Sequence, residues 1–87
     1  MSFNIPSNHN LKFSYTRADR PQEWNVFADG KFIGTANKVA ASAYEGHDIG
    51  GRRVTYLCGP GARGYTAESL AHYAGLLDEN YNLLGGK

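Results

Sequence analysis

The sequence contains little cysteine, little excess charge and no long hydrophobic run, and each shortage excludes a class of protein. The single cysteine, Cys58, cannot form an internal disulfide, so the fold does not depend on one. Nine Lys or Arg residues against eight Asp or Glu leave a net charge of +1, which argues against a general nucleic-acid coat protein. No apolar run approaches the length of a membrane span, and the first residues lack the pattern of a signal peptide. We therefore expect a cytoplasmic protein without a membrane partner.

Aromatic residues, in contrast, are plentiful for a chain of 87 residues: six Tyr, four Phe and one Trp. With 41% hydrophobic residues, the composition is that of a folded protein. Because the chain is short, we expect a single domain over residues 11–84, preceded by a flexible arm at 1–10 and followed by a tail at 85–87. Tyrosine combines an apolar face with a polar tip, so it suits interfaces as well as cores.

The strongest local signal is the dipeptide Asp29-Gly30 between two apolar segments. Asp-Gly tolerates the positive φ angles of a two-residue type I′ turn, so the dipeptide predicts a β-hairpin. The expected cross-strand pairs are Ala28 with Lys31, Phe27 with Phe32, Val26 with Ile33 and Trp24 with Thr35. Because side chains alternate along a strand, Trp24, Val26 and Ile33 share one face, and Phe27 and Phe32 meet on the other. Both faces are therefore partly apolar, and the one that no helix covers needs a cover or a partner.

The remaining segments predict further strands and one helix. Residues 11–17 alternate in polarity, and residues 53–58 are rich in β-branched and aromatic side chains, so both are expected to be strands. Thr66 is a good cap for a C-terminal helix with an apolar stripe at Ala67, Leu70, Ala74, Leu77, Tyr81 and Leu84. Residues 38–45 favour a short helix, with a continued strand as the alternative. The expected fold class is α+β: a small antiparallel sheet of about four strands with the C-terminal helix packed on one face.

The loop before this helix contains Gly59, Gly61 and Gly64 in the spacing G-x-G-x-x-G. Backbone amides at a helix start attract phosphate, so the three glycines are a candidate anion-binding site. Pro60 removes one of the amides that a phosphate cradle would use, and no Walker-type Gly-Lys-Ser or Gly-Lys-Thr occurs. A flexible turn is the simpler interpretation, and we expect no cofactor.

The residue types that most often carry catalysis or metals show no recognisable pattern. The three histidines, His9, His47 and His72, lack metal-ligand spacing, with or without Asp48, so no metal site is predicted. A Cys58–histidine pair of nucleophile and base is conceivable, but an unpaired cysteine is most often a small buried residue, and this is what we expect. No carboxylate pair is recognisable for acid–base catalysis, so we expect that the protein is not an enzyme.

These observations favour a small non-catalytic binding protein that docks on a larger protein and inhibits or modulates it. The favoured example, by analogy of size and charge rather than by a shared motif, is a phage-type (anti-CRISPR) or accessory inhibitor of a host defence nuclease complex. The expected contacts are five aromatic residues and three arginines: Trp24, Phe27, Phe32, Tyr44, Tyr65, Arg52, Arg53 and Arg63. The alternative is a small nucleic-acid-binding domain that uses the arginine and aromatic residues of the sheet. A homodimer through an uncovered sheet face is a further alternative.

Overall fold

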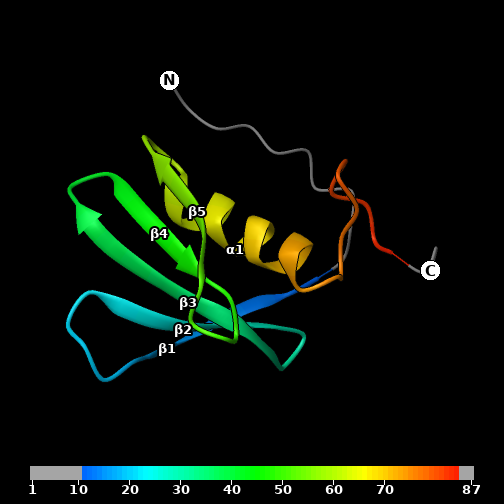
Figure 1. Cartoon of the computed structure of the whole chain (residues 1–87), viewed down its shortest axis with the longest axis horizontal. Coiled ribbons are helices and arrows are strands. Elements are labelled where there is room, and N and C mark those ends of the chain that lie inside the picture. Colours follow the sequence, from blue (N-terminus) through cyan, green and yellow to red (C-terminus); the bar gives the residue numbers. More distant parts are fainter. Residues whose placement is uncertain (1–10, 85–87) are drawn as a thin grey trace.

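A computed structural model describes residues 11–84, which form five strands followed by one helix (Figure 1). The elements are β1 (Phe13–Arg17), β2 (Glu23–Ala28), β3 (Lys31–Ala40), β4 (Ala43–His47), β5 (Arg53–Cys58) and α1 (Ala62–Tyr73). Each strand pairs antiparallel with the next in the chain, in the order β1-β2-β3-β4-β5. The predicted α+β class is confirmed, with five strands rather than about four. The arm predicted at 1–10 and the tail predicted at 85–87 lie outside the described residues.

The hairpin predicted at Asp29-Gly30 is confirmed. Both residues have positive φ, 50° and 83°, as a two-residue turn of this kind requires. The pairs next to the turn, Ala28 with Lys31 and Phe27 with Phe32, are those expected from the sequence.

Beyond these pairs a β-bulge shifts the register, so that Val26 pairs with Gly34 and Trp24 with Ala36. The expected partners, Ile33 and Thr35, are therefore wrong by one residue. The bulge depends on Gly34, which has a φ of +144° and at which a Cβ atom would lie 2.2 Å from the carbonyl oxygen of His47.

The short helix predicted for residues 38–45 is wrong, and the alternative of a strand is right. β3 continues to Ala40, a turn follows at 41–42, and β4 begins at Ala43. Lys38 pairs with Tyr44 and Ala40 with Ala43, and Val39 is the extra residue of a second bulge. The helical propensity of this alanine-rich segment is small, and strand pairing on both sides of the segment outweighs it.

The C-terminal helix α1 begins earlier and ends earlier than predicted. Gly61, in the left-handed conformation, is the N-cap residue, five positions before the cap expected at Thr66. Thr66 instead lies inside the helix, where its buried hydroxyl donates to the carbonyl of Ala62 at 2.7 Å. Gly75, with a φ of 84°, follows the last turn and stops the helix, which therefore does not reach Leu84.

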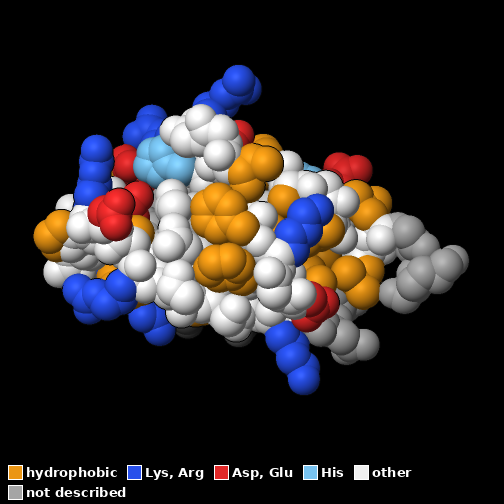
Figure 2. Space-filling model, turned by 90° about the horizontal axis from the view of Figure 1, so that it is seen from below, with side chains coloured by type: hydrophobic (Ala, Val, Ile, Leu, Met, Phe, Trp, Pro, Cys, Tyr) orange, Lys and Arg blue, Asp and Glu red, His pale blue; other side chains and the backbone are white. Residues whose placement is uncertain are grey.

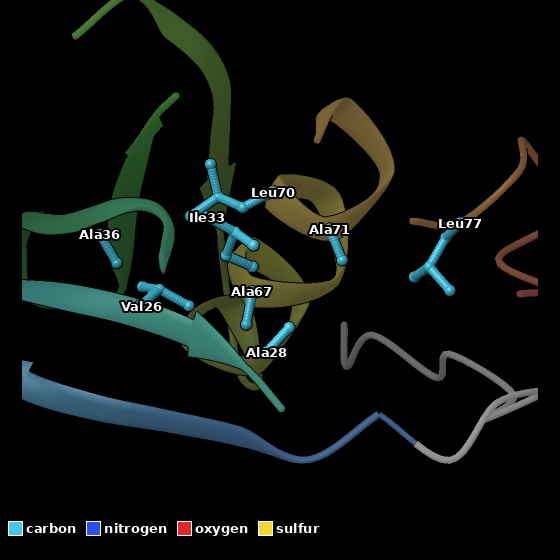
Figure 3. Close-up of a cluster of buried hydrophobic side chains, with 8 residues drawn as sticks. All are labelled: Val26, Ala28, Ile33, Ala36, Ala67, Leu70, Ala71 and Leu77. Carbon is cyan, nitrogen blue, oxygen red and sulfur yellow. The ribbon is translucent and has the colours of Figure 1, made fainter. Parts of the chain in front are cut away.

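The hydrophobic core lies between the sheet and α1 (Figure 3). Eight buried side chains form it: Val26, Ala28, Ile33, Ala36, Ala67, Leu70, Ala71 and Leu77. Small residues let the two layers approach closely: at Gly46 of β4, an added Cβ atom would lie 3.0 Å from Thr66 Cγ2 of α1, and it would also lie 2.5 Å from Thr55 Cγ2 of the neighbouring strand. In the predicted apolar stripe Ala67, Leu70 and Leu77 are buried as expected, whereas Ala74 is exposed.

His72 holds the segment after the helix in place. Its Nδ1 atom lies 3.0 Å from the Leu77 carbonyl oxygen and 3.1 Å from that of Asp78, and its ring stacks on Tyr81 at 6.0 Å. Leu77 is thereby fixed in the core although it follows the last helical turn, and it bridges to Leu83. The segment 77–84 is a folded turn that covers the end of the core.

Candidate functional site

Strand pairing divides the side chains of the sheet between two faces, because directly opposed residues of antiparallel strands point to the same side. One face carries Val26, Ala36 and Gly46 and packs against α1. We call the opposite side the open face, since no helix among residues 11–84 covers it. Three of the rows that cross this face are Ser14, Phe27 and Phe32; Thr16, Asn25, Thr35, His47 and Arg53; and Glu23, Asn37, Glu45 and Tyr56.

An aromatic pair, Phe27 and Phe32, lies in the first row of the open face. The ring centroids are 5.6 Å apart and the planes are inclined by 58°, a geometry typical of attractive ring contacts. Phe32 is 40% exposed and Phe27 is half-buried. Seen from below, on the side of β1 to β3 that faces away from α1, hydrophobic side chains gather near the middle of the surface, with a histidine and charged groups toward one end (Figure 2).

Hydrogen bonds and ion pairs order part of the polar surface beside the aromatic pair. The side-chain amide of Asn25 donates to the Thr16 hydroxyl at 3.2 Å. Arg53 donates to one carboxylate oxygen of Glu45 at 3.2 Å, and Nε2 of His47 lies 3.9 Å from the other. Two side-chain contacts thus join neighbouring strands on this face, Asn25 with Thr16 and Arg53 with Glu45.

A polar groove is hollowed into the open face over the third row. Its main part has a volume of about 430 Å³ and is lined by Arg20, Glu23, Thr35, Asn37, Glu45, His47 and Gly51. A second hollow of about 290 Å³ shares Arg20, Glu23 and Thr35 and continues toward the β1–β2 turn at residues 17–19. Residues of β2, β3 and β4 form the floor, whereas Arg20 and Gly51 come from the turns at the two ends. The groove therefore offers carboxylate, amide and hydroxyl groups on a rigid floor.

The eight partner-binding residues predicted from the sequence do not form one surface. Phe27, Phe32 and Arg53 lie on the open face, and Arg52 lies in the turn before β5. The other four lie on the helix side: Trp24 and Tyr44, with ring centroids 6.4 Å apart; Arg63, 5.7 Å from the centroid of the Tyr15 ring; and Tyr65, 6.1 Å from Tyr81. None of the eight is among the residues that line the polar groove or the adjoining hollow.

Sequence reasoning missed the groove residues Glu23, Asn37, Glu45 and His47. Part of the signal was readable, because Glu23 and Asn25 precede Phe27 at steps of two and so share its face. The sequence favoured a helix for residues 38–45, which include Glu45, so the pairing of Glu45 with Asn37 on adjacent strands was not predicted.

The three glycines predicted as an anion site fall into two different elements. Gly59 and Gly61 precede α1 with φ angles of 110° and 82°, whereas Gly64 lies within the helix. The amide of Gly59 already donates to the Ser42 carbonyl at 2.8 Å, and the amide of Ala62 donates to the Gly59 carbonyl at 3.1 Å. These amides are turned to the protein itself, so fewer remain for an anion than the motif implies.

Cys58 is exposed, contrary to the expectation of a small buried residue. It lies two positions after Tyr56 on the edge strand β5, and a hydrogen bond with Cys58 is the main cause that raises the pKa of Tyr56 above its ordinary value. Side chains two positions apart on a strand share a face, so Cys58 lies on the open face with Tyr56, which explains the exposure of the thiol. Within residues 11–84 no group of three His, Cys, Asp or Glu residues is arranged to hold a metal ion.

The chain matches no protein-family model, and searches of curated proteins and of solved structures find no significant similarity. Within the described part of the chain, no helix has the length and apolar character needed to cross a membrane. The open face, with its aromatic pair and its polar groove, is the feature on which a function can be argued.

Proposed function

We propose that this protein is a non-catalytic binding domain that docks on a larger protein through the open face and inhibits or modulates it. The observation that supports this is the aromatic pair, Phe27 and Phe32, on a sheet face without a helical cover and beside the polar groove. Protein interfaces combine a few aromatic anchors with a polar rim in the same way.

The rigidity of the open face also suits docking. Its side chains stand on five paired strands, so few groups need to be ordered when a partner binds. A partner that sits across β1 to β4 would be held by a large surface of a very small domain, which is how a small inhibitor covers a functional surface of a larger protein. The favoured partner class is a host defence nuclease complex, with this chain as a phage-type or accessory inhibitor.

Nucleic-acid binding is the second candidate, since Phe27, Phe32 and Tyr56 share the open face with Arg53. The charges on this face favour a protein instead. Glu23 and Glu45 would repel phosphates, and Arg53 is already paired with Glu45 at 3.2 Å. A nucleic acid usually needs a clear basic surface, which the open face lacks among its described residues.

A capture experiment with two matched variants tests the docking function. Wild type, Phe32→Ser and Tyr73→Ser are immobilised and exposed to lysate of the source organism or its host, with and without nuclease and at low and moderate salt. Retained proteins are identified by mass spectrometry. Tyr73 is the control because it is also an exposed aromatic residue, 57% exposed, but lies on α1. We expect a protein that wild type and Tyr73→Ser retain at moderate salt and that Phe32→Ser loses.

Two outcomes would contradict the proposal. Retention that is equal for Phe32→Ser and wild type would remove the open face as the docking surface. Retention that disappears with nuclease, or that falls steeply between low and moderate salt, would favour direct binding to nucleic acid, because phosphate contacts are strongly salt-dependent.

A further inference from the structure

We propose that the polar groove receives a basic side chain of the docked protein, with the guanidinium group of arginine as the best fit, while the aromatic pair receives an apolar side chain of the same partner. This inference rests on the proposed docking function and names the chemistry of the partner. The geometry that points to it is a row of three acceptor-bearing side chains, Glu23, Asn37 and Glu45, on adjacent strands.

The row forms an acidic floor with an amide at its centre. Glu23 pairs with Asn37, and Asn37 pairs with Glu45, so the three residues stand side by side on β2, β3 and β4. Neighbouring strands are about 4.8 Å apart, which puts the two carboxylates on either side of the Asn37 amide at a backbone separation of about 10 Å. A planar guanidinium group has five donors and can contact a carboxylate and the amide oxygen together, whereas an ammonium group is a more compact point charge.

The carboxylate of Glu23 is available to pair with a cation of the partner. Its side chain is half-buried in the groove, and no ion pair joins it to a cation within residues 11–84. Glu45 is paired with Arg53, but the Arg53 side chain is 60% exposed, and exposed ion pairs contribute little and exchange readily. A cation from a partner can therefore form an ion pair with Glu23 and share the Glu45 carboxylate with Arg53.

The other charges that face the groove are at its rim or on one side of it. Arg20 lines the groove from the β1–β2 turn and is exposed, and Arg17 and Asp19 line the adjoining hollow. His47 stands beside Glu45 on β4. The cationic rim over an acidic floor fits a partner segment in which a basic side chain enters the groove while acidic or polar groups remain outside.

The distance between the groove and the aromatic pair sets the spacing of the partner residues. Glu23 and Phe27 are four residues apart on β2, a span of about 13 Å at 3.3 Å per residue. An extended partner segment covers this distance with an apolar and a basic residue four positions apart, and a helical one with residues about nine positions apart.

NMR titration of the ¹⁵N-labelled full chain tests the inference with defined peptides. The main probe is acetyl-Leu-Ser-Thr-Ser-Arg-amide, and the matched probe replaces arginine with citrulline, which has nearly the same shape and no charge. We expect shifts at the backbone amides of Glu23 and Glu45 and at the Asn37 side-chain amide, and about tenfold tighter binding of the arginine peptide. A peptide that ends in glutamate instead of arginine is expected not to shift these signals.

Variants of Glu23 and Glu45 show whether their carboxylates cause the tighter binding of the arginine peptide. Glu23→Gln and, independently, Glu45→Gln are expected to weaken the arginine peptide by about tenfold and to leave the citrulline peptide unchanged. Glu79→Gln is the control, since Glu79 is an exposed carboxylate in the turn after α1. The amide spectrum of each variant reports whether it is folded.

The outcomes separate this inference from the docking function. Equal binding of the arginine and citrulline peptides, absence of groove shifts up to millimolar arginine peptide, or preference for the glutamate peptide would each overturn the basic-side-chain inference. If these occur while Phe32→Ser still loses a captured protein, docking stands and only the groove chemistry fails. If the arginine peptide binds through Glu23 but no captured protein depends on Phe32, the groove chemistry stands and docking through the aromatic pair fails.

Discussion

The two faces of the sheet differ in the size and polarity of the side chains that they present. At the core, the side chains that the strands direct toward α1 are small or aliphatic, such as Ala28 and Ala36, and the helix contributes Ala67 and Ala71. Small side chains on both layers allow close approach, so the core is tightly packed. The open face carries phenylalanines, carboxylates, amides and hydroxyls, and they surround a groove instead of filling it.

Under the proposed docking function, one face of the sheet would serve stability and the other would serve binding. An 87-residue chain has a small stability margin, and we expect the face that packs against α1 to supply most of it, because the hydrophobic core lies there. Side chains on the open face could then be selected for binding to a partner, because they contribute little to stability. If this is correct, equal truncations on the two faces should affect different properties, and the following predictions test that from the largest expected effect to the smallest.

Leu70→Ala should cause the largest loss of stability. Leu70 is completely buried between α1 and the sheet, and removing such a side chain costs about 3 kcal/mol through lost burial and the cavity left behind. Phe32→Ala removes a larger side chain from the open face, but because Phe32 is 40% exposed the loss should be only about 1 kcal/mol. Urea denaturation of both variants measures the difference. Equal losses would mean that the open face belongs to the core.

Gly46→Ala tests how closely the helix approaches the sheet. The added Cβ atom would meet Thr66 Cγ2 of α1 at 3.0 Å and Thr55 Cγ2 of the neighbouring strand β5 at 2.5 Å, so both the helix and β5 must shift, at a cost of about 2 kcal/mol. Gly64→Ala is the control, because a Cβ atom there has no neighbour within 4 Å, and alanine favours the helix by up to about 1 kcal/mol. Thermal unfolding should therefore move in opposite directions for the two variants. A Gly46→Ala protein as stable as wild type would contradict the close packing.

The same contrast explains which parts of the structure are predictable from the sequence. The Asp29-Gly30 turn and the Phe27–Phe32 pair depend on neighbouring residues alone, and both are confirmed. The bulge after Phe32 depends on the approach of Gly34 to the His47 carbonyl, a residue thirteen positions away that no local pattern indicates.

The polar groove could not be predicted from the sequence, for a related reason. Its floor joins residues of β2, β3 and β4, and Glu45 reaches it only because residues 38–45 pair as strands despite their alanine-rich composition. A site assembled by strand pairing can be read from a sequence only when every strand in it is assigned correctly. Predicting the aromatic pair requires one correctly assigned hairpin, whereas predicting the groove requires three strands in the correct register.

Tyr15 should show the smallest effect, at the margin of the packed face. It lies on the helix side of β1, opposite Val26, where it is 37% exposed and has the Arg63 guanidinium 5.7 Å from its ring centroid. Partial burial raises the pKa of the Tyr15 hydroxyl above its ordinary value of 10.0, and Arg63, which lowers this pKa, does not cancel the effect.

Because the folded-state pKa of Tyr15 exceeds the unfolded value, folding favours the protonated hydroxyl. Its contribution to stability is complete below about pH 10 and is lost as the pH rises through the folded-state pKa. Tyr15→Phe has no hydroxyl to ionise, so its stability relative to wild type should increase between pH 9 and pH 11, measured by urea denaturation at each pH. Parallel pH profiles for the two proteins would place Tyr15 in contact with solvent and would move the boundary of the packed face inward from β1.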